Sequence, residues 1–310
     1  MRWLTVGKTA VGIDIGGTNI RASNISEDGR IIKGLKEPLS SSPIESAIAL
    51  IDGIITDDTV GIGVGVAGIV DRGSGRVTLS PNIPQIVDIS ITRAIQERFH
   101  LPVVVENDAD AYAYGEKWVG SGKGFKDFVL LTLGTGIGGG IIYDGDLFKG
   151  AAEVGHMIIE GEGVKCACGG YGCLEAYASG RAIVNKAVEA IEKGQDTILR
   201  ACCNGNFYKL TGELIYRAAL DGDNLSREIF RDFGRYLGIG MATLANLFSP
   251  EAIILGGGLL GAWDLFIELA RKEFHRRTLA PLQQKVSIIK SSLGQDAGAI
   301  GAAGLVFKSL

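Results

Sequence analysis

Apolar residues recur along the chain with two different periods, and the elements they predict alternate between strands and helices. Short apolar or alternating runs bounded by glycine or Asp-Gly predict strands at 11–15, 19–25, 30–35, 60–66, 103–105, 128–133, 141–143, 252–255 and 286–289. Apolar positions three or four residues apart predict helices at 43–55, 88–99, 109–118, 179–192, 211–220, 226–247, 263–274 and 297–310. This succession predicts an α/β fold with mixed sheets rather than one open parallel sheet.

One stretch of this pattern occurs twice. Residues 11–29 read as strand, glycine turn, strand and Asp-Gly turn, and residues 128–145 read in the same order, with Gly134–Gly140 as their glycine turn. We interpret the repeat as a divergent internal duplication with one phosphate loop in each lobe. Chance repetition in a glycine-rich chain is the alternative.

Composition narrows the class of protein. The chain of 310 residues is long enough for two lobes, and its net charge of -4 provides no basic surface for nucleic acid. No apolar run is long enough to span a bilayer, and residues 1–10 contain no apolar leader segment. The 46 glycines gather in several separate loops, which favours a large polyanionic ligand held by main-chain amides. The odd number of cysteines, five, favours a reducing compartment, so we expect a cytoplasmic protein.

The glycine spacing also suggests a dinucleotide enzyme, which the surrounding sequence disfavours. G-x-G-x-x-G begins at Gly63, Gly134 and Gly256. That fingerprint needs a strand before it, a helix after it and an acidic residue about 20 positions on. The first two matches lead into strands or loops, and the strand after the third ends in Lys290-Ser291.

Two glycine turns carry hydroxyl groups suited to phosphate. In Asp14-Ile-Gly-Gly-Thr18 a carboxylate at a strand end precedes the turn, where it can hold Mg²⁺ through water while amides and the threonine hydroxyl meet phosphate oxygens. Taken alone, this segment is more typical of an ordinary hairpin in which Asp14 binds the turn amides. Gly134-Thr135-Gly136 supplies a second turn of the same kind, which favours the phosphate interpretation.

Glu106-Asn107-Asp108 lies between a predicted strand and a predicted helix. A carboxylate at such a junction is partly desolvated and can act as a general base, the one group that phosphoryl transfer needs beside the attacking hydroxyl. The alternative is that Asn107 or Asp108 caps the helix, and both roles are compatible.

Cysteine spacing gives the strongest chemical signal in the chain. Cys166, Cys168 and Cys173 lie among glycines, in a spacing that suits a tight knuckle around tetrahedral Zn²⁺. A fourth ligand is needed, and His156 lies just upstream, whereas the other two histidines are remote. Four protein ligands would make the zinc structural. Free buried thiols are the alternative.

These segments together resemble the ROK family (repressors, open-reading-frame proteins and sugar kinases) of the actin/hexokinase superfamily. The matching segments follow the family's order through most of the chain, at 12–19, 65–71, 80–84, 106–108, 133–140, 153–156, 166–175 and 255–258. The cysteine cluster ending in Glu175, combined with the rest, makes the resemblance specific. Gln85-Ile86 stands where many family kinases have Gly-Trp, and Ala67 stands where proline is common.

The resemblance implies a two-lobed actin/hexokinase-like (ribonuclease H-like) fold with an internal duplication and a zinc knuckle. It implies a small lobe of residues 1–108 and 295–310, and a large lobe of residues 109–294 that contains the zinc motif and the nucleotide site. It also implies a homodimeric sugar kinase that uses ATP with Mg²⁺ and phosphorylates glucose on its 6-hydroxyl.

Individual positions match the family's functional residues. Asp108 matches the catalytic base. The sugar-binding positions match Gly68, Asn82, Asn107, Asp108, Glu153, His156 and Glu175. The phosphate and magnesium positions match Asp14, Gly16, Gly17, Thr18, Asn19, Gly134, Thr135 and Gly136, and the adenosine positions match Gly256, Gly257 and Gly258. The zinc ligands match His156, Cys166, Cys168 and Cys173.

Other functions within the family stay open. The acceptor could instead be N-acetylmannosamine, N-acetylglucosamine, mannose, allose or fructose, and the donor could be polyphosphate. A sugar sensor without catalysis is disfavoured because both Asp14 and Asp108 are present. The family's repressors carry a helix-turn-helix domain before the Asp-x-Gly-Gly-Thr segment, and only 13 residues precede Asp14 here, so we expect no nucleic-acid partner. Because the apolar runs are short, we also expect no membrane partner.

Overall fold

A computed structural model describes residues 7–203 and 205–310, which form two compact units. Among the described residues, the first unit comprises 7–130, 140–152 and 291–310, and the second comprises 131–139, 153–203 and 205–290. The predicted lobes, which divide the chain differently at 109–130, 140–152 and 291–294, stay a prediction. The sequence predicts no leader segment in residues 1–10. Residues 1–6 of this range lie outside the described residues.

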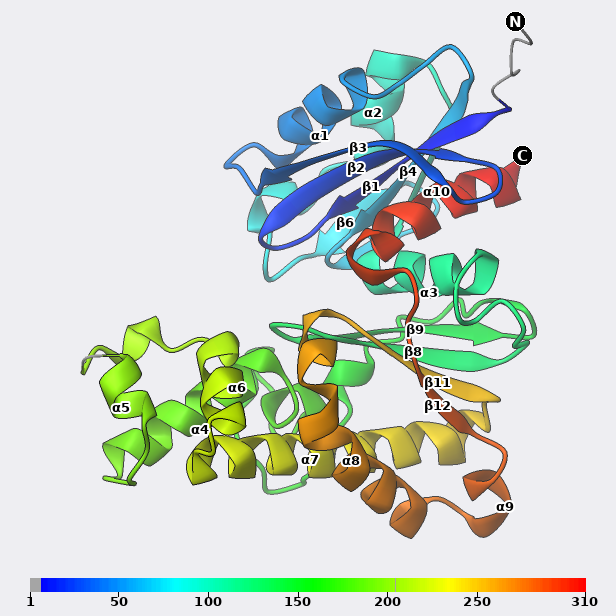
Figure 1. Cartoon of the computed structure of the whole chain (residues 1–310). Coiled ribbons are helices and arrows are strands. Elements are labelled where there is room, and N and C mark those ends of the chain that lie inside the picture. Colours follow the sequence, from blue (N-terminus) through cyan, green and yellow to red (C-terminus); the bar gives the residue numbers. More distant parts are fainter. Residues whose placement is uncertain (1–6, 204) are drawn as a thin grey trace, which may run out of the picture. The chain divides into compact units, whose positions relative to one another are not determined.

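A five-stranded sheet organises the first unit (Figure 1). Its strands are β1 (Thr9–Ile15), β2 (Asn19–Ser26), β3 (Ile31–Pro38), β4 (Thr59–Val66) and β7 (Val103–Asn107), in the order β3-β2-β1-β4-β7. The first three strands are antiparallel neighbours, as the predicted glycine and Asp-Gly turns require. Strands β1, β4 and β7 are parallel, so their carboxyl ends lie along one edge of the sheet.

The second sheet repeats this order. It consists of β8 (Phe128–Leu133), β9 (Ile137–Tyr143), β10 (Asp146–Leu147), β11 (Ala252–Gly256) and β12 (Ser287–Lys290), in the order β10-β9-β8-β11-β12. In both sheets the strands follow one another as third, second, first, fourth and fifth in chain order. The predicted internal duplication is therefore visible in the topology. The division between the two units passes through β8 and β9.

Helices cover both faces of the first sheet. On one face, α1 (Pro43–Asp52) and α2 (Ile91–Phe99) contribute Ile44, Ala47 and Ile95 to an apolar core shared with β1 and β4. On the other face lie α10 (Ala297–Ser309) and α3 (Asp108–Trp118), which pack against each other. Because β1 is covered on both sides, it is apolar along almost its whole length rather than alternating.

Helix α10 approaches its neighbours so closely that only glycine fits at three contacts. A Cβ added at Gly12 or at Gly63 would lie 1.9 Å from a carbonyl oxygen of α10. A Cβ added at Gly301, on α10 itself, would lie 1.6 Å from the carbonyl oxygen of Ala111 on α3. The glycine content of the chain therefore serves backbone packing as well as turns.

We expect Gly301→Ala to destabilise the protein by about 3 kcal/mol, because the added methyl forces α10 and α3 apart. Helix propensity alone predicts the opposite sign, a gain of roughly 1 kcal/mol. Urea unfolding measures the difference. Gly212→Ala is the matched control, because a Cβ at Gly212 would meet nothing within 4 Å. Equal effects of the two substitutions would contradict the steric argument.

The second unit is mostly helical. Its principal helices are α4 (Gly180–Glu192), α6 (Gly212–Leu220), α7 (Asn224–Phe248) and α8 (Trp263–Arg277). Gly234 and Gly238 let α7 and α8 approach closely, since a Cβ at either position would lie 2.4 Å from a carbonyl oxygen of α8. Beside them, Phe233 and Phe266 pack edge to face with centroids 5.0 Å apart. No helix in the described ranges is long and apolar enough to cross a membrane.

The remaining elements are short, and no local pattern in the sequence predicted them. They are β5 (Ile69–Asp71), β6 (Arg76–Leu79), α5 (Leu199–Cys202), α9 (Ala280–Gln283), η1 (Pro84–Ile86), η2 (Val154–His156), η3 (Leu174–Ala176), η4 (Phe207–Lys209), η5 (Gly258–Ala262) and η6 (Gly294–Asp296).

Several predicted boundaries were wrong by three or more residues: the helix predicted at 43–55 ends at residue 52, the strand predicted at 30–35 extends to 38, and the helix predicted at 263–274 extends to 277. Two further errors have a local cause. The glycine turn predicted at Gly134–Gly140 ends at residue 136, and the next three glycines belong to β9. Helix α2 begins at Ile91 rather than at Asp88, because Ser90 caps it and Asp88 has a positive φ of 63°.

Candidate active site

The parallel strands of the first unit bring two predicted site residues to one edge of the sheet. Ile15 on β1 pairs with Val66 on β4, which pairs with Asn107 on β7. Asp14 therefore lies at the end of β1 and Asp108 begins the helix that follows β7. The charge of Asp108 contributes to the raised pKa of Asp14, so the two carboxylates are electrostatically coupled.

Asp108 occupies the first turn of α3, which Asn107 caps. The Oδ1 of Asn107 accepts hydrogen bonds from the amides of Ala109 at 2.9 Å and Asp110 at 3.1 Å, and its Nδ2 donates to the carbonyl of Gly68 at 2.9 Å. Three predicted sugar-binding residues thus meet within this turn. Burial raises the pKa of Asp108, while its bond from the Ala109 amide acts in the opposite direction. A carboxyl with a raised pKa at a helix start suits a general base.

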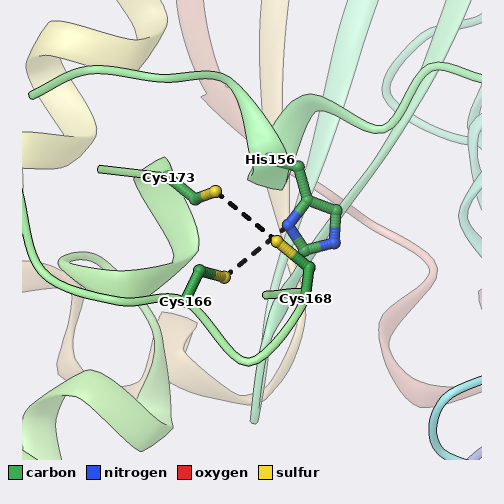
Figure 2. Close-up of side chains that lie close together, drawn as sticks. All are labelled: His156, Cys166, Cys168 and Cys173. Carbon is green, nitrogen blue, oxygen red and sulfur yellow. Dashed lines mark hydrogen bonds between the residues drawn. The ribbon is translucent and has the colours of Figure 1, made fainter. Parts of the chain in front are cut away.

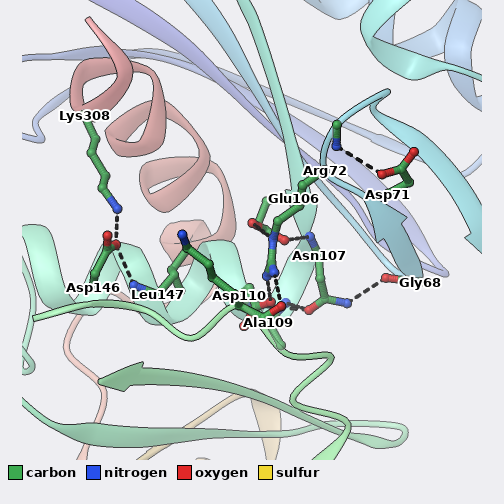
Figure 3. A network of polar contacts seen from close by, with 12 residues as sticks. Gly68, Asp71, Arg72, Glu106, Asn107, Ala109, Asp110, Asp146, Leu147 and Lys308 are labelled. Carbon is green, nitrogen blue, oxygen red and sulfur yellow. Dashed lines mark hydrogen bonds and ion pairs between the residues drawn. The ribbon is translucent and has the colours of Figure 1, made fainter. Parts of the chain in front are cut away.

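A network of ion pairs, in which Arg72 is exposed and its partners are buried, flanks this turn (Figure 3). The Nε of Arg72 donates to Glu106 at 2.6 Å, and its second terminal nitrogen donates to Asp110 at 2.8 Å. Both carboxylates are almost fully buried. Burial opposes the charge of Arg72, but hydrogen bonds and the charges of Glu106 and Asp110 outweigh it and raise the pKa of Arg72. The network fixes the residues on both sides of Asn107 and Asp108.

The surroundings of Asp14 disfavour its negative charge, so a bound cation would stabilise it. Burial, followed by the charge of Asp108, raises the pKa of Asp14 to about 7, and Arg21 only partly compensates. The start of α10 causes much of this burial, since a Cβ at Gly298 would lie 3.0 Å from the Asp14 carboxyl carbon. Two neighbouring carboxylates that resist ionisation fit a divalent cation, which would favour the charged form of both.

Asp14→Asn is expected to stabilise the protein in magnesium-free buffer more at pH 8 than at pH 5. Between the unfolded pKa of 3.8 and the folded pKa of about 7, the folded protein retains a proton that the unfolded chain has lost. Stability from this group is therefore complete below pH 3.8 and is lost as pH rises through about 7. Asparagine cannot ionise, so its advantage should grow by on the order of 2 kcal/mol between pH 5 and pH 8. Calorimetric Tm values at both pH values test this, and equal shifts would contradict it.

The first glycine turn leaves main-chain donors for a ligand. The amide of Gly16 is satisfied by the carbonyl of Asn19 at 3.0 Å. The amides of Gly17 and Thr18 donate to no group in residues 7–203 and 205–310, and both residues are exposed. Asn82 lies beside this turn, with its Cβ 3.2 Å from the position of a Cβ on Gly17. The turn therefore has the donors that a phosphate needs.

The second glycine turn has the same property and borders a cavity. The Gly134 amide donates to the carbonyl of Gly136 at 3.0 Å, and no described hydrogen bond uses the amides of Thr135 and Gly136. The cavity has a volume of about 550 Å³, the size of a small-molecule site. It is lined by Gly134, Thr135, Gly180, Arg181, Val184, Asn185, Gly212, Gly258 and Leu259. The predicted phosphate turn and one predicted adenosine-side glycine thus line one cavity of the second unit.

Gly257 shows why the adenosine-side segment is glycine-rich. It adopts a φ of 91°, and a Cβ there would lie 2.4 Å from the carbonyl oxygen of Leu133. Only glycine permits both the conformation and the close approach of β11 to β8. This contact brings the segment from Gly256 to Gly258 next to the end of the strand that carries the second turn.

The predicted zinc ligands meet in the second unit (Figure 2). The ligand atoms of His156, Cys166, Cys168 and Cys173 all lie within 4.8 Å of one another. The Sγ atoms of Cys168 and Cys173 are 3.7 Å apart, and Cys166 Sγ lies 3.8 Å from His156 Nδ1. Tetrahedral zinc with bonds of about 2.3 Å separates two sulfurs by roughly 3.8 Å. The spacing suits a shared ion and is far too long for a disulfide.

The thiols of this cluster also have the electrostatics of a cation site. Burial, and then hydrogen bonds from Cys168 and Cys166, raise the pKa of Cys173 to about 12. Burial likewise raises the pKa of Cys166, whereas a backbone hydrogen bond from Gly170 lowers that of Cys168. Three thiolates cannot coexist here without a compensating charge, which a bound Zn²⁺ would supply.

The two remaining sugar-site candidates of the second unit lie around this cluster. Glu153 precedes η2, which ends at His156, and Glu175 lies on η3, directly after Cys173. The Oε2 of Glu175 accepts a hydrogen bond from the amide of Ile137 at 2.9 Å. Glu175 therefore joins the zinc segment to the second glycine turn.

Several residues of these sites were not identified from the sequence. Arg72 lies next to the matched segment 65–71, but its partners are more than 30 positions away. Arg181 and Asn185 line the cavity from α4, and Gly212 lines it from α6. The sequence did contain a signal for the residues on α4, because a helix was predicted to start at Ser179, soon after the cysteine segment. The amides of Gly180 and Arg181 at this helix start donate to the glycine turn.

The chain belongs to the ROK family, whose model matches residues 10–309. It is 38% identical over 306 residues to a glucokinase of Streptomyces coelicolor, covering 95% of this chain and 96% of that protein. It is also 33% identical to the xylose repressor of Bacillus subtilis, covering 96% of this chain but 76% of the repressor. A crystal structure of a ROK family glucokinase from Streptomyces griseus, in complex with glucose and AMPPNP, superposes with a TM-score of 0.86. That match covers 97% of this chain and 99% of that one, at 36% identity, so the predicted two-lobed α/β fold is confirmed.

Proposed function

We propose that this protein is an ATP-dependent glucokinase, which transfers the γ-phosphate of ATP to the 6-hydroxyl of glucose. One observation carries the proposal: Asp108 combines a raised pKa with a fixed place at the start of α3, next to Asn107, whose side chain donates to the carbonyl of Gly68. The similarity to glucokinases extends over nearly the whole chain, which supports the same chemistry here.

In the proposed mechanism, Asp108 accepts the proton of the 6-hydroxyl as that oxygen attacks the γ-phosphorus. The new phosphorus–oxygen bond forms while the bond to the β-phosphate breaks, and ADP leaves with the electron pair. Amides of Gly17, Thr18, Thr135 and Gly136 would bind phosphate oxygens, because they are available as donors. Asp14 would hold Mg²⁺ through water, and Mg²⁺ neutralises phosphate charge in such reactions.

Recognition of the sugar is assigned to Gly68, Asn82, Asn107, Glu153, His156 and Glu175. His156 and the cysteines Cys166, Cys168 and Cys173 would hold Zn²⁺, which stabilises the fold of its loop rather than taking part in the reaction. With Nδ1 of His156 toward the thiols, Nε2 is the ring nitrogen that would donate to a sugar hydroxyl. Gly256, Gly257 and Gly258 would lie on the adenosine side of the nucleotide.

A sugar-responsive regulator without catalysis is the second candidate, since xylose repressors are 33–34% identical to this chain. The presence of Asp14 near Asp108 favours the kinase, because sugar binding alone needs no second carboxylate whose pKa the first one raises. Among kinases, glucose is proposed ahead of N-acetylmannosamine, N-acetylglucosamine, mannose, allose and fructose.

An enzyme-coupled assay of ADP release over a panel of these sugars tests the proposal. We expect glucose to give the highest kcat/KM with MgATP, and polyphosphate to be a poorer donor. Turnover with another hexose at a higher kcat/KM would keep the kinase and replace the sugar. No turnover with any sugar, together with measurable glucose binding, would favour the regulator.

Two further expectations concern the protein in solution. We propose a homodimer and a cytoplasmic location, both from the family resemblance. Analytical ultracentrifugation at micromolar concentration tests the first, and fractionation of the source cells tests the second.

A further inference from the structure

The segment that follows the last zinc-ligand candidate holds the second glycine turn at three points. The amide of Gly180 donates to the carbonyl of Gly134 at 2.8 Å, and the amide of Arg181 donates to the carbonyl of Thr135 at 3.1 Å. The carboxylate of Glu175 accepts from the amide of Ile137 at 2.9 Å. The turn is thus held on both its carbonyl side and its amide side by residues 175–181.

Of these three contacts with the turn, the one from Glu175 is made by a side chain and the other two by the backbone. Its Oε2 lies so close to the turn that a Cβ on Gly136 would be 2.3 Å away, so a side chain at position 136 would displace this carboxylate. Its other oxygen, Oε1, has no hydrogen-bond partner within residues 7–203 and 205–310. One oxygen of Glu175 therefore holds the turn, and the other is available to a hydroxyl of the hexose.

We propose that Glu175 positions the glycine turn for the nucleotide and thereby couples hexose binding to nucleotide binding. The inference rests on the proposed kinase function and adds a role to a residue assigned there only to the sugar. A hexose bound to Oε1 restricts the carboxylate, which in turn restricts the amide of Ile137 and the turn that lines the cavity. By thermodynamic reciprocity, the nucleotide strengthens hexose binding by the same factor.

Calorimetric titration with AMPPNP and Mg²⁺ in the absence of sugar tests the role of Glu175 in the turn. Glu175→Ala and Glu175→Gln both remove the negative charge, but only glutamine retains an oxygen that can accept from Ile137. We expect the Kd of the alanine variant to exceed that of the glutamine variant about tenfold, within the usual range of coupling between sites. Glu192→Ala, at the exposed end of α4, is the control and should leave the Kd unchanged.

Hydrogen exchange on the wild-type protein gives a second test that needs no variant to fold. Glucose alone should slow exchange at the amide of Ile137. Equal AMPPNP affinities for the alanine and glutamine variants, or exchange at Ile137 that glucose leaves unchanged, would overturn the coupling. If the wild type forms ADP with a hexose, such a result removes only the coupling. If the wild type neither binds AMPPNP nor forms ADP with any hexose, both the coupling and the kinase fail.

Discussion

Asp108→Asn should leave glucose binding nearly intact while lowering kcat by about 10²- to 10⁴-fold, the usual contribution of a general base. An amide cannot take up the proton of the attacking hydroxyl. Its oxygen can still accept the hydrogen bond that Asp108 receives from the Ala109 amide at 2.9 Å, so the start of α3 should keep its geometry. Calorimetry with glucose and the ADP-release assay separate binding from turnover.

The pH dependence of kcat is a second test of the role of Asp108 as the base. The base must be ionised, and burial raises the pKa of Asp108, so wild-type kcat should rise with pH above the ordinary range of an aspartate. This acidic limb should disappear in Asp108→Asn. Asp264→Asn, in the exposed first turn of α8, is the matched control and should keep both the rate and the limb. A variant at position 108 with more than about a tenth of wild-type kcat would exclude the role as base.

The elements that the sequence predicted well are those whose local signals agree with their packing. Strand β8 begins and ends as predicted, since it is a run of apolar residues, interrupted only by Thr132, between turn residues. Helices α3, α4 and α6 begin at polar caps, here Asn107, Ser179 and Thr211, whose side chains accept the expected amide bonds. In these elements, propensity and tertiary packing favour the same boundaries.

Strand β9 was mispredicted because tertiary packing overrode a local signal. Three consecutive glycines are typical of a turn, yet residues 138–140 lie in the sheet. A Cβ at Gly140 would lie 2.6 Å from the carbonyl oxygen of Ala109 and 2.5 Å from the side chain of Ala113. The glycine is required by the approach of α3, a contact between segments that no local window contains.

Among the candidate sites, too, some residues are identified by local sequence and others only by the fold. The four zinc-ligand candidates lie within 18 consecutive positions, so spacing alone identified the cluster that the structure brings together. Arg72 joins Glu106 and Asp110 across 34 and 38 positions, and nothing in its local sequence distinguishes it from a surface arginine. Networks of this kind depend on the fold, and a single sequence does not reveal them.

Removal of the proposed zinc should have the largest effect on stability. We expect about one zinc per chain in the native protein, and we expect Cys168→Ser to lose it and to lower the Tm by at least about 5 °C. Cys166 and Cys173 are buried, and burial raises the pKa of both thiols, so both are neutral without the ion. The cysteine segment then loses the zinc–sulfur bonds that would hold it together. Elemental analysis and differential scanning fluorimetry measure the two effects.

A second cysteine makes the zinc prediction specific. Cys202 is exposed, as Cys168 is, but it lies outside the cluster on α5, so Cys202→Ser should keep both the zinc and the Tm. A chelator should lower the Tm of the wild type and of Cys202→Ser equally, and should have little effect on Cys168→Ser. Native protein without zinc, or equal Tm values for the two variants, would mean that the thiols are only packed together. Because η3 with Glu175 directly follows Cys173, the loss of zinc should also raise the KM for glucose.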